Sequence, residues 1–122
     1  MSKLTFVLLC GLAACSNAKK PARLEVQQRT IALGTIAKDT TCLLQYELEN
    51  TGGAVLQVDT VSASCGCTVP EQTSFRIAPL EKHTLVLRFQ PPDTGAFNKK
   101  VVVRSNTDSL YTILSFNGYA RK

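Results

Sequence analysis

Two cysteines separated by one glycine, Cys65-Gly66-Cys67, are the residues of this chain best suited to chemistry. A local disulfide between them would need the bent backbone that Gly66 permits, and strain would make it easy to reduce. Alternatively, Cys42 bridges to either cysteine and closes a loop of about 25 residues, which stabilises a fold by a few kcal/mol. The sequence leaves open which pairing forms, so a structural bridge and a redox pair are both alternatives.

Metal binding is a third alternative for the same thiols. Cys42, Cys65, Cys67 and His83 would supply a Cys3His set to zinc, and the two close thiolates would hold copper(I). However, one C-x-C pair with a distant cysteine and a lone histidine is a weak motif. His83, at the start of an expected strand, is typical of an exposed turn residue. We therefore expect no cofactor and keep these four residues only as weak candidates for metal ligands.

Other arrangements typical of enzymes are missing from the sequence. The glutamates show no spacing of an acid and base pair, and those that alternate along a strand are typical of its solvated face. No glycine loop is followed by the lysine and helix start that would cradle a phosphate, and the serines before Cys65 have no histidine close in sequence. These observations favour a non-catalytic protein without a small-molecule substrate.

The first 14 residues are typical of a bacterial lipoprotein leader. Lys3 precedes an apolar run over 4–14, which has the length of a signal-peptide core and is too short to span a membrane. Leu12-Ala13-Ala14-Cys15 resembles a lipobox, in which small residues precede a cysteine that receives a diacylglycerol. Cys10 follows two leucines, which would not fit such a cleavage site, so we expect its removal with the leader. The sequence predicts a signal peptide over 1–14 and a lipid on Cys15.

A polar segment follows, and we interpret residues 15–23 as a lipidated tether. Lys19, Lys20 and Arg23 would favour anionic head groups by about 1 kcal/mol each, but a tether that is simply solvated is the interpretation we prefer. The formal net charge is a mild +5, and the basic residues form no stripe interleaved with aromatics, which argues against nucleic acid as a partner. Ser16, rather than Asp, after the acylated cysteine favours the outer membrane by analogy with other lipoproteins. We expect a lipid-anchored envelope protein that faces the periplasm.

The chain after the tether has room for one domain. Of the 122 residues, 19% are charged and 44% are hydrophobic, a balance typical of a globular domain rather than a disordered chain or repeated membrane spans. The sequence therefore predicts a single domain over 24–122.

Short alternating segments fill this domain. Cys42, Leu44, Tyr46 and Leu48 alternate with polar residues, the period of a half-buried strand. Further strands are expected at 23–33, 55–61, 74–78, 84–90, 97–104 and 110–120, while 62–72 breaks the pattern. About seven strands at this spacing predict an all-β sandwich, with a barrel as the alternative.

Turns and edges follow from the same pattern. Gly34 is expected to end the first strand, and Asn50-Thr51-Gly52-Gly53 is expected to form a turn because its residues tolerate positive φ. Lys99-Lys100 and Pro91-Pro92 are expected on edge strands, where they would discourage pairing with other sheets.

A series of short motifs resembles one bacterial family. The motifs are Asn50-Thr51-Gly52, Ser64-Cys65-Gly66-Cys67-Thr68, Ile77-Ala78-Pro79, Gly95-Ala96-Phe97 and Ser105-Asn106. Their order resembles the family catalogued as domain of unknown function 1573, over about residues 31 to 120. Two departures are visible, since the family's usual Phe-Gly is Leu33-Gly34 here and its Pro-Gly turn is Pro79-Leu80.

The resemblance implies an immunoglobulin-like sandwich similar to major sperm protein and ciliary ASH domains. Such domains are frequent in envelope lipoproteins of the Bacteroidetes type, and the family supplies no activity. We therefore expect a lipid-anchored, non-catalytic module that binds another envelope protein through an edge strand or loop. A thiol-redox or metal-binding protein that uses Cys65 and Cys67 is the alternative.

Overall fold

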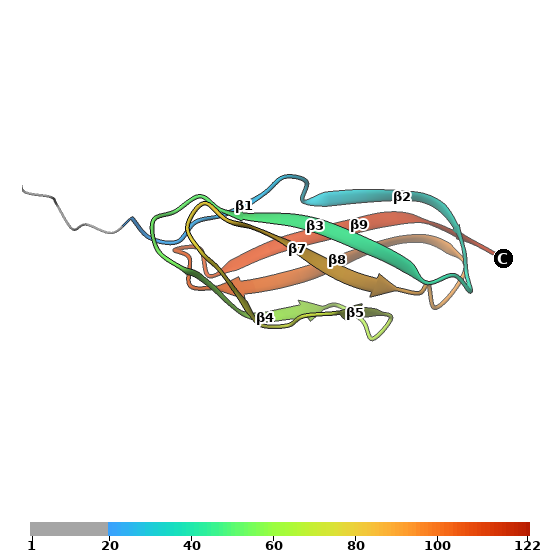
Figure 1. Cartoon of the computed structure of the whole chain (residues 1–122). Helices are drawn as coiled ribbons and strands as arrows, with labels where there is room; N and C mark the ends of the chain where they lie inside the picture. Colours follow the sequence, from blue (N-terminus) through green and yellow to red (C-terminus); the bar gives the residue numbers. More distant parts are fainter. Residues whose placement is uncertain (1–19) are drawn as a thin grey trace, which may run out of the picture.

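The computed structural model describes residues 20–122, which form nine β-strands in two stacked sheets (Figure 1). Sheet A has the strand order β1-β3-β7-β5 and sheet B the order β2-β9-β8-β4-β6. The strands are β1 Leu24–Val26, β2 Thr30–Ala37, β3 Cys42–Asn50, β4 Leu56–Ala63, β5 Thr68–Pro70, β6 Phe75–Ile77, β7 Lys82–Phe89, β8 Gly95–Ser105 and β9 Tyr111–Arg121. The predicted leader and Cys15 lie outside the described residues.

Alternation along the strands builds the core between the sheets. In β3, Leu44, Tyr46 and Leu48 are buried while the residues between them face solvent, as predicted. The same pattern in β8 and β9 points Val101, Val103 and other apolar side chains inward. No helix within residues 20–122 is long and apolar enough to cross a membrane. The predicted all-β sandwich is thus confirmed.

Aromatic side chains join the two sheets at the centre of the core. Phe89 of sheet A packs against Phe97 and Phe116 of sheet B, with ring centroids 4.9 and 4.8 Å away. Tyr46 crosses from sheet A, and its Oη donates a hydrogen bond to the carbonyl oxygen of Ser115 at 2.6 Å. Burial raises the pKa of Tyr46 to about 12, so this hydroxyl stays protonated and keeps its donor.

The N-terminal part of the domain differs from the prediction of one strand over 23–33. β1 pairs antiparallel with β3 in sheet A, whereas β2 pairs parallel with β9 in sheet B. Gly34 does not end a strand, because it lies inside β2 at a shift of register, with a φ of 69°. Gly118 of β9 faces it, and a Cβ at Gly118 would lie 2.6 Å from the Gly34 carbonyl oxygen. The glycine signal therefore marks a bulge rather than a turn.

The edges of the sheets differ in part from expectation. Lys99-Lys100 lies in β8 where its pairing with β4 ends, since the last pair is Val101 with Ala63 and beyond it Ser64 N donates to the Lys100 carbonyl oxygen. This part of β8 pairs in a ladder with β9 alone, so the two lysines lie at an open edge, as expected. Pro91-Pro92 follows β7 in a loop. The segment 62–72, expected to be irregular, contains the end of β4 and the short strand β5. The strands at the two ends of each sheet are β1 and β5 in sheet A and β2 and β6 in sheet B.

The turn before β7 contains an unusual backbone conformation. Glu81 N donates to the Ala78 carbonyl oxygen at 3.0 Å, and Leu80 has a φ of 66°. These features, with Pro79 before Leu80, correspond to a type II turn, in which glycine is the favoured residue at the position of Leu80. The departure from Pro-Gly noted in the sequence therefore keeps the turn but places a leucine in a left-handed conformation.

A buried amide, Asn50, organises one end of the sandwich. Its Oδ1 accepts hydrogen bonds from the backbone N of Arg23 and Gly52 at 3.2 and 3.0 Å. Its Nδ2 donates to the carbonyl oxygens of Ala54 and Ile77 at 2.7 and 3.0 Å. The side chain thus joins the chain before β1, the turn after β3 and the end of β6.

Glycine is needed at position 52, two residues after Asn50, for a reason other than positive φ. Positive φ values in residues 20–122 occur at Gly34, Gly95, Leu80 and Leu110. A Cβ at Gly52 would overlap the Pro21 carbonyl oxygen and lie 2.6 Å from the backbone N of Arg23. The turn therefore requires glycine because the N-terminal segment crosses directly over it.

We predict that Asn50→Ala lowers the free energy of unfolding by about 3 kcal/mol, because four hydrogen-bonded backbone groups lose their partner in a buried site. Urea denaturation measures the change. Asn98→Ala is the matched control, since Asn98 is exposed on β8 and its loss should leave the midpoint nearly unchanged. Equal midpoints for the two variants would contradict this role of Asn50.

Candidate functional site

The Cys65-Gly66-Cys67 motif lies in the loop that connects β4 of sheet B to β5 of sheet A. Of the alternatives considered, the structure contains the local disulfide between Cys65 and Cys67, with the Cα atoms 5.3 Å apart. Thr68 N donates to the Cys65 carbonyl oxygen, which closes a tight turn around the pair. Gly66 is exposed, has no positive φ, and a Cβ there would meet nothing within 4 Å. The fold itself therefore does not require glycine at this position.

Cys42 lies at the same end of the sandwich but keeps a free, half-buried thiol. It opposes Phe89 of β7, and Thr68 opposes Phe89 from the other side. Two strand spacings, about 10 Å, therefore separate Cys42 from the residue after Cys67. Because the disulfide already pairs Cys65 with Cys67, Cys42 forms neither of the bridges considered from the sequence.

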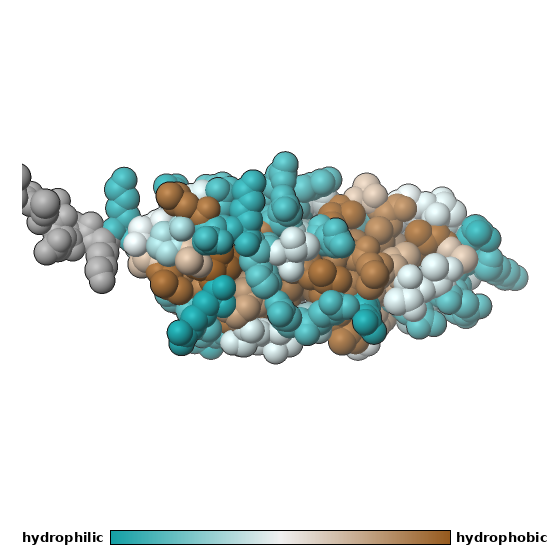
Figure 2. All heavy atoms as spheres, viewed as in Figure 1, coloured by the Kyte–Doolittle hydropathy of each residue, from teal (hydrophilic) through white to brown (hydrophobic). Residues whose placement is uncertain are grey.

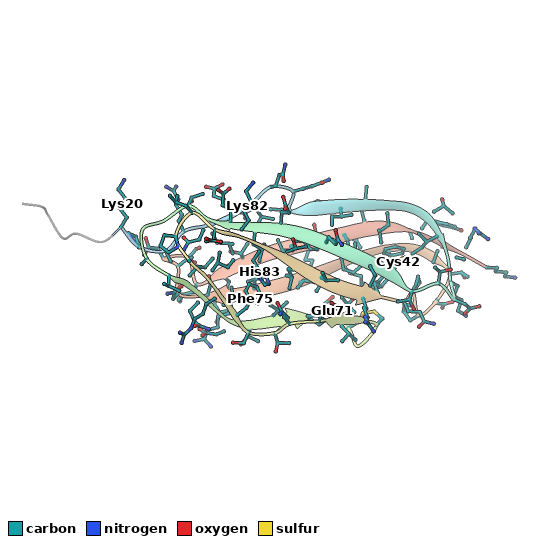
Figure 3. All side chains as sticks on the ribbon, viewed as in Figure 1. Lys20, Cys42, Glu71, Phe75, Lys82 and His83 are labelled. Atoms are coloured by element: carbon teal, nitrogen blue, oxygen red, sulfur yellow. A yellow bond between two sulfur atoms is a disulfide. The ribbon has the colours of Figure 1, made fainter. Side chains whose placement is uncertain are left out.

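His83 lies toward the other end of the molecule (Figure 3). It opposes Leu48, whereas Cys42 opposes Phe89, so about six residues of strand or ~20 Å separate His83 from the cysteines. The structure therefore does not bring the four weak metal-ligand candidates together. Among the described residues, no group of three or more His, Cys, Asp or Glu side chains could hold a metal ion.

The ring of His83 packs against an aromatic side chain of the other sheet. Its ring stacks on Phe75 of β6, with centroids 4.0 Å apart and planes at 16°, so it bridges the two sheets. Its Nε2 is buried without a hydrogen-bond partner, and burial lowers its pKa from the ordinary value of 6.5. The expectation of an exposed turn residue is corrected, because β6 covers the ring.

A shallow pocket of about 560 Å³ opens beside the disulfide. Cys67 and Gly66 form part of its wall, together with Val69 and the basic side chains of Lys38 and Arg88. Exposed apolar side chains adjoin it, and brown spheres gather at this end of the visible face in Figure 2. A shallow mixed surface of this kind suits contact with a polypeptide better than enclosure of a small molecule. Sequence reasoning missed this pocket because its residues come from three separate stretches of the chain, within 38–41, 66–69 and 88–92.

We predict that His83 makes stability fall in mild acid. Below pH 6.5 the unfolded chain binds a proton at this imidazole more readily than the folded chain does, since burial lowers the folded pKa. The contribution of His83 to the free energy of unfolding is therefore complete above about pH 6.5. It decreases as the pH falls toward the pKa of His83 in the folded chain. His83→Phe keeps the stacking on Phe75 and should flatten the pH dependence of the melting temperature between pH 7 and 5. An unchanged slope would contradict the assignment.

We predict that Cys65→Ser combined with Cys67→Ser lowers the free energy of unfolding by only about 1.5 kcal/mol, because the disulfide closes a loop of three residues. Thermal unfolding gives the change. Reductant added to the unaltered chain is the matched control and should produce the same shift in melting temperature. A much larger loss would mean that the loop itself contributes to the core.

Several solved structures have a fold similar to this sandwich. The described sandwich is similar to an ASH/PapD-like domain of human CEP192, at 13% identity and a TM-score of 0.70, over 84% of this chain and 87% of that chain. It is also similar to a protein of unknown function from Porphyromonas gingivalis W83, at 15% identity and a TM-score of 0.71, over 84% of this chain and 48% of that one. At these identities the similarity establishes the fold alone.

A third similar structure is the chaperone–tip adhesion subunit pre-assembly complex CsuC–CsuE of the Acinetobacter baumannii Csu pili. The identity is 15% and the TM-score 0.63, over 82% of this chain and 58% of that chain. The chain thus spans only about half the length of this structure and of the Porphyromonas gingivalis protein. A comparison with curated protein sequences gives no match.

The family comparison agrees with the motifs identified in the sequence. The model described as a protein of unknown function, DUF1573, matches residues 24–120, nearly all of the described sandwich. This confirms the resemblance carried by the Asn-Thr-Gly and Ser-Cys-Gly-Cys-Thr motifs, and the chain therefore belongs to the DUF1573 family.

Proposed function

We propose that this chain is a lipid-anchored, non-catalytic module of the bacterial cell envelope that binds a partner protein by accepting a β-strand at the edge of β2. The observation that carries this proposal is the length and composition of that edge. β2 pairs with β9 on one side only, and its eight residues, TIALGTIA, contain no charged residue and no proline.

The other edges contrast with β2. β1, β5 and β6 have three residues each; β5 contains Pro70 and β6 contains Arg76. Short strands, prolines and charges are the usual protections against unwanted strand pairing, and β2 has only the bulge at Gly34. Figure 1 shows no other strand along the outer side of β2. An edge of this length offers main-chain groups for strand addition, a common mode of peptide recognition.

The similar solved structures support this class of function. One of them is a pre-assembly complex of a pilus chaperone with an adhesion subunit, and two further similar structures are the chaperones YadV and DraB. A chaperone acts on other proteins, so in these structures the same type of sandwich belongs to a protein that binds proteins. We therefore favour protein binding over a thiol-redox or metal-binding role.

The leader supports the lipid anchor. The apolar run over 4–14 and the Leu12-Ala13-Ala14-Cys15 motif would attach the chain at Cys15. Lys20, the first described residue, lies at one end of the long axis of the sandwich (Figure 3). A lipid on Cys15 would thus hold the domain by one end, with both the β2 edge and the disulfide loop free.

We predict that Cys15→Ala releases the protein from cell membranes. Metabolic labelling with a fatty acid and fractionation after a carbonate wash measure the change. Cys10→Ala is the matched control and should leave labelling and membrane association intact. Retention of the Cys15→Ala protein in the washed membrane pellet would refute the anchor at this residue.

We predict that Ala32→Lys, which places a charge in the exposed edge strand, weakens partner binding at least about tenfold, or 1.4 kcal/mol. A photocrosslinking residue at position 32 first identifies the partner in cells, and titration of the purified proteins then gives the affinities. Thr84→Lys is the matched control, because Thr84 is exposed on β7, away from the β2 edge. Equal affinities for the two variants would overturn strand addition at β2.

A further inference from the structure

Three large apolar side chains are exposed in the loops at the Asn50 end of the sandwich. Val55, Leu80 and Leu110 have 48%, 77% and 49% of their surface accessible. Hydrogen bonds place their loops together, since Leu80 N donates to the Asn50 carbonyl oxygen and Asn106 Nδ2 donates to the Val55 carbonyl oxygen. Figure 2 shows brown surface at this end, between hydrophilic side chains.

Two of these side chains occupy backbone positions that disfavour leucine. Leu80 and Leu110 have φ values of 66° and 62°, and they are the two residues other than glycine with positive φ in the described chain. A side chain other than glycine's strains the backbone in this conformation, because its Cβ crowds the neighbouring carbonyl oxygen. Because Leu80 is 77% exposed and Leu110 is 49% exposed, packing in the domain offsets this strain only in part. Strained residues of this kind are typical of functional positions.

We infer that this end of the sandwich, the Leu80–Leu110 tip with Val55, inserts into the surface of the membrane to which the chain is tethered. The inference rests on the proposed lipid anchor. Lys20 enters the fold at the same end, where the segment before β1 crosses Gly52 and Gly53. Five Cα–Cα steps lead from Cys15 to Lys20, a reach of at most about 18 Å. An acylated Cys15 therefore holds the tip within contact distance of the bilayer.

The charges at the tip identify the kind of contact. Lys20, Arg23 and Lys82 are exposed there, but the acidic Glu81 follows Leu80 directly and Asp108 lies two residues before Leu110. Nearly balanced charges give little attraction to anionic head groups. The contact is therefore apolar burial at the boundary between head groups and acyl chains, to a depth of about 5–10 Å, and it depends little on anionic lipid.

Tip insertion fixes the orientation of the domain on the membrane. The long strands run from the tip to the disulfide end, and β9 alone has 11 residues, about 37 Å of extended chain. The pocket beside Cys65 and Cys67 would then stand one strand length above the bilayer. β2 would run away from the surface with its free edge accessible to a partner.

Tryptophan fluorescence tests the inference, because the chain contains no tryptophan. The chain from residue 15 onward, with a hexahistidine tag in place of the predicted leader, is bound to vesicles of phosphatidylcholine with a nickel-chelating lipid, in which part of the phosphatidylcholine has brominated acyl chains. Leu80→Trp and Leu110→Trp should show blue-shifted emission that the brominated lipid quenches. Leu43→Trp is the matched control, since Leu43 is 60% exposed near the opposite end of β3 and its emission should not change.

A second variant keeps the test independent of folding. Leu80→Gly removes the apolar side chain and relieves the left-handed leucine, so in the Leu110→Trp chain it should reduce quenching without lowering the unfolding midpoint. Replacement of part of the phosphatidylcholine by phosphatidylglycerol should leave the quenching nearly unchanged. Quenching that is equal at positions 43, 80 and 110, or absent at 80 and 110, overturns the inference.

The tag also separates this inference from the proposed function. It holds the chain on the vesicle whether or not cells acylate Cys15, so loss of fatty-acid labelling would refute the anchor without changing the fluorescence result. Conversely, a labelled protein whose tryptophans at positions 80 and 110 are not quenched keeps its anchor and lacks tip insertion.

Discussion

A single buried amide holds together three parts of the chain: the segment before β1, the turn after β3 and the end of β6. Asn50 satisfies backbone groups of Arg23, Gly52, Ala54 and Ile77, and its own backbone bonds to the turn before β7. These groups lie where strands end, so no ladder of hydrogen bonds is available to them, and leaving them unpaired in the interior would be costly. The amide therefore allows short loops at this end and fixes where the N-terminal segment enters the domain.

The sequence was most informative where burial alternates on one strand. Leu44, Tyr46 and Leu48 were correctly placed in the core because period two depends only on local residue order. The division of 23–33 between two sheets was missed, since alternation indicates which side chains are buried but not which sheet contains them. Gly34 was misread for a related reason: a left-handed glycine serves equally in a turn or in a bulge, and only the partner strand β9 decides between them.

The family motifs divide between the two ends of the sandwich. Asn50-Thr51-Gly52 and Ser105-Asn106 are explained by hydrogen bonds and close backbone packing within the domain. At the other end, Cys65-Gly66-Cys67 was correctly selected as a feature, but which cysteines pair is a matter of distance in space, which spacing in the sequence could not give. Most of the length of β7 separates His83 from these cysteines, and this distance likewise could not be predicted from sequence spacing.

The parallel pairing of β2 with β9 sets the order in which this domain can be completed. Thr30 lies beside Ser115, so one of the first strands to be synthesised finds its neighbour only when the last strand has emerged. Until then β2, which contains no charged residue, has no paired strand on either side, and contacts this distant in sequence form slowly. The interval between synthesis and closure is therefore when the chain is most exposed to pairing with other unfolded strands, and when a folding helper would be of greatest use.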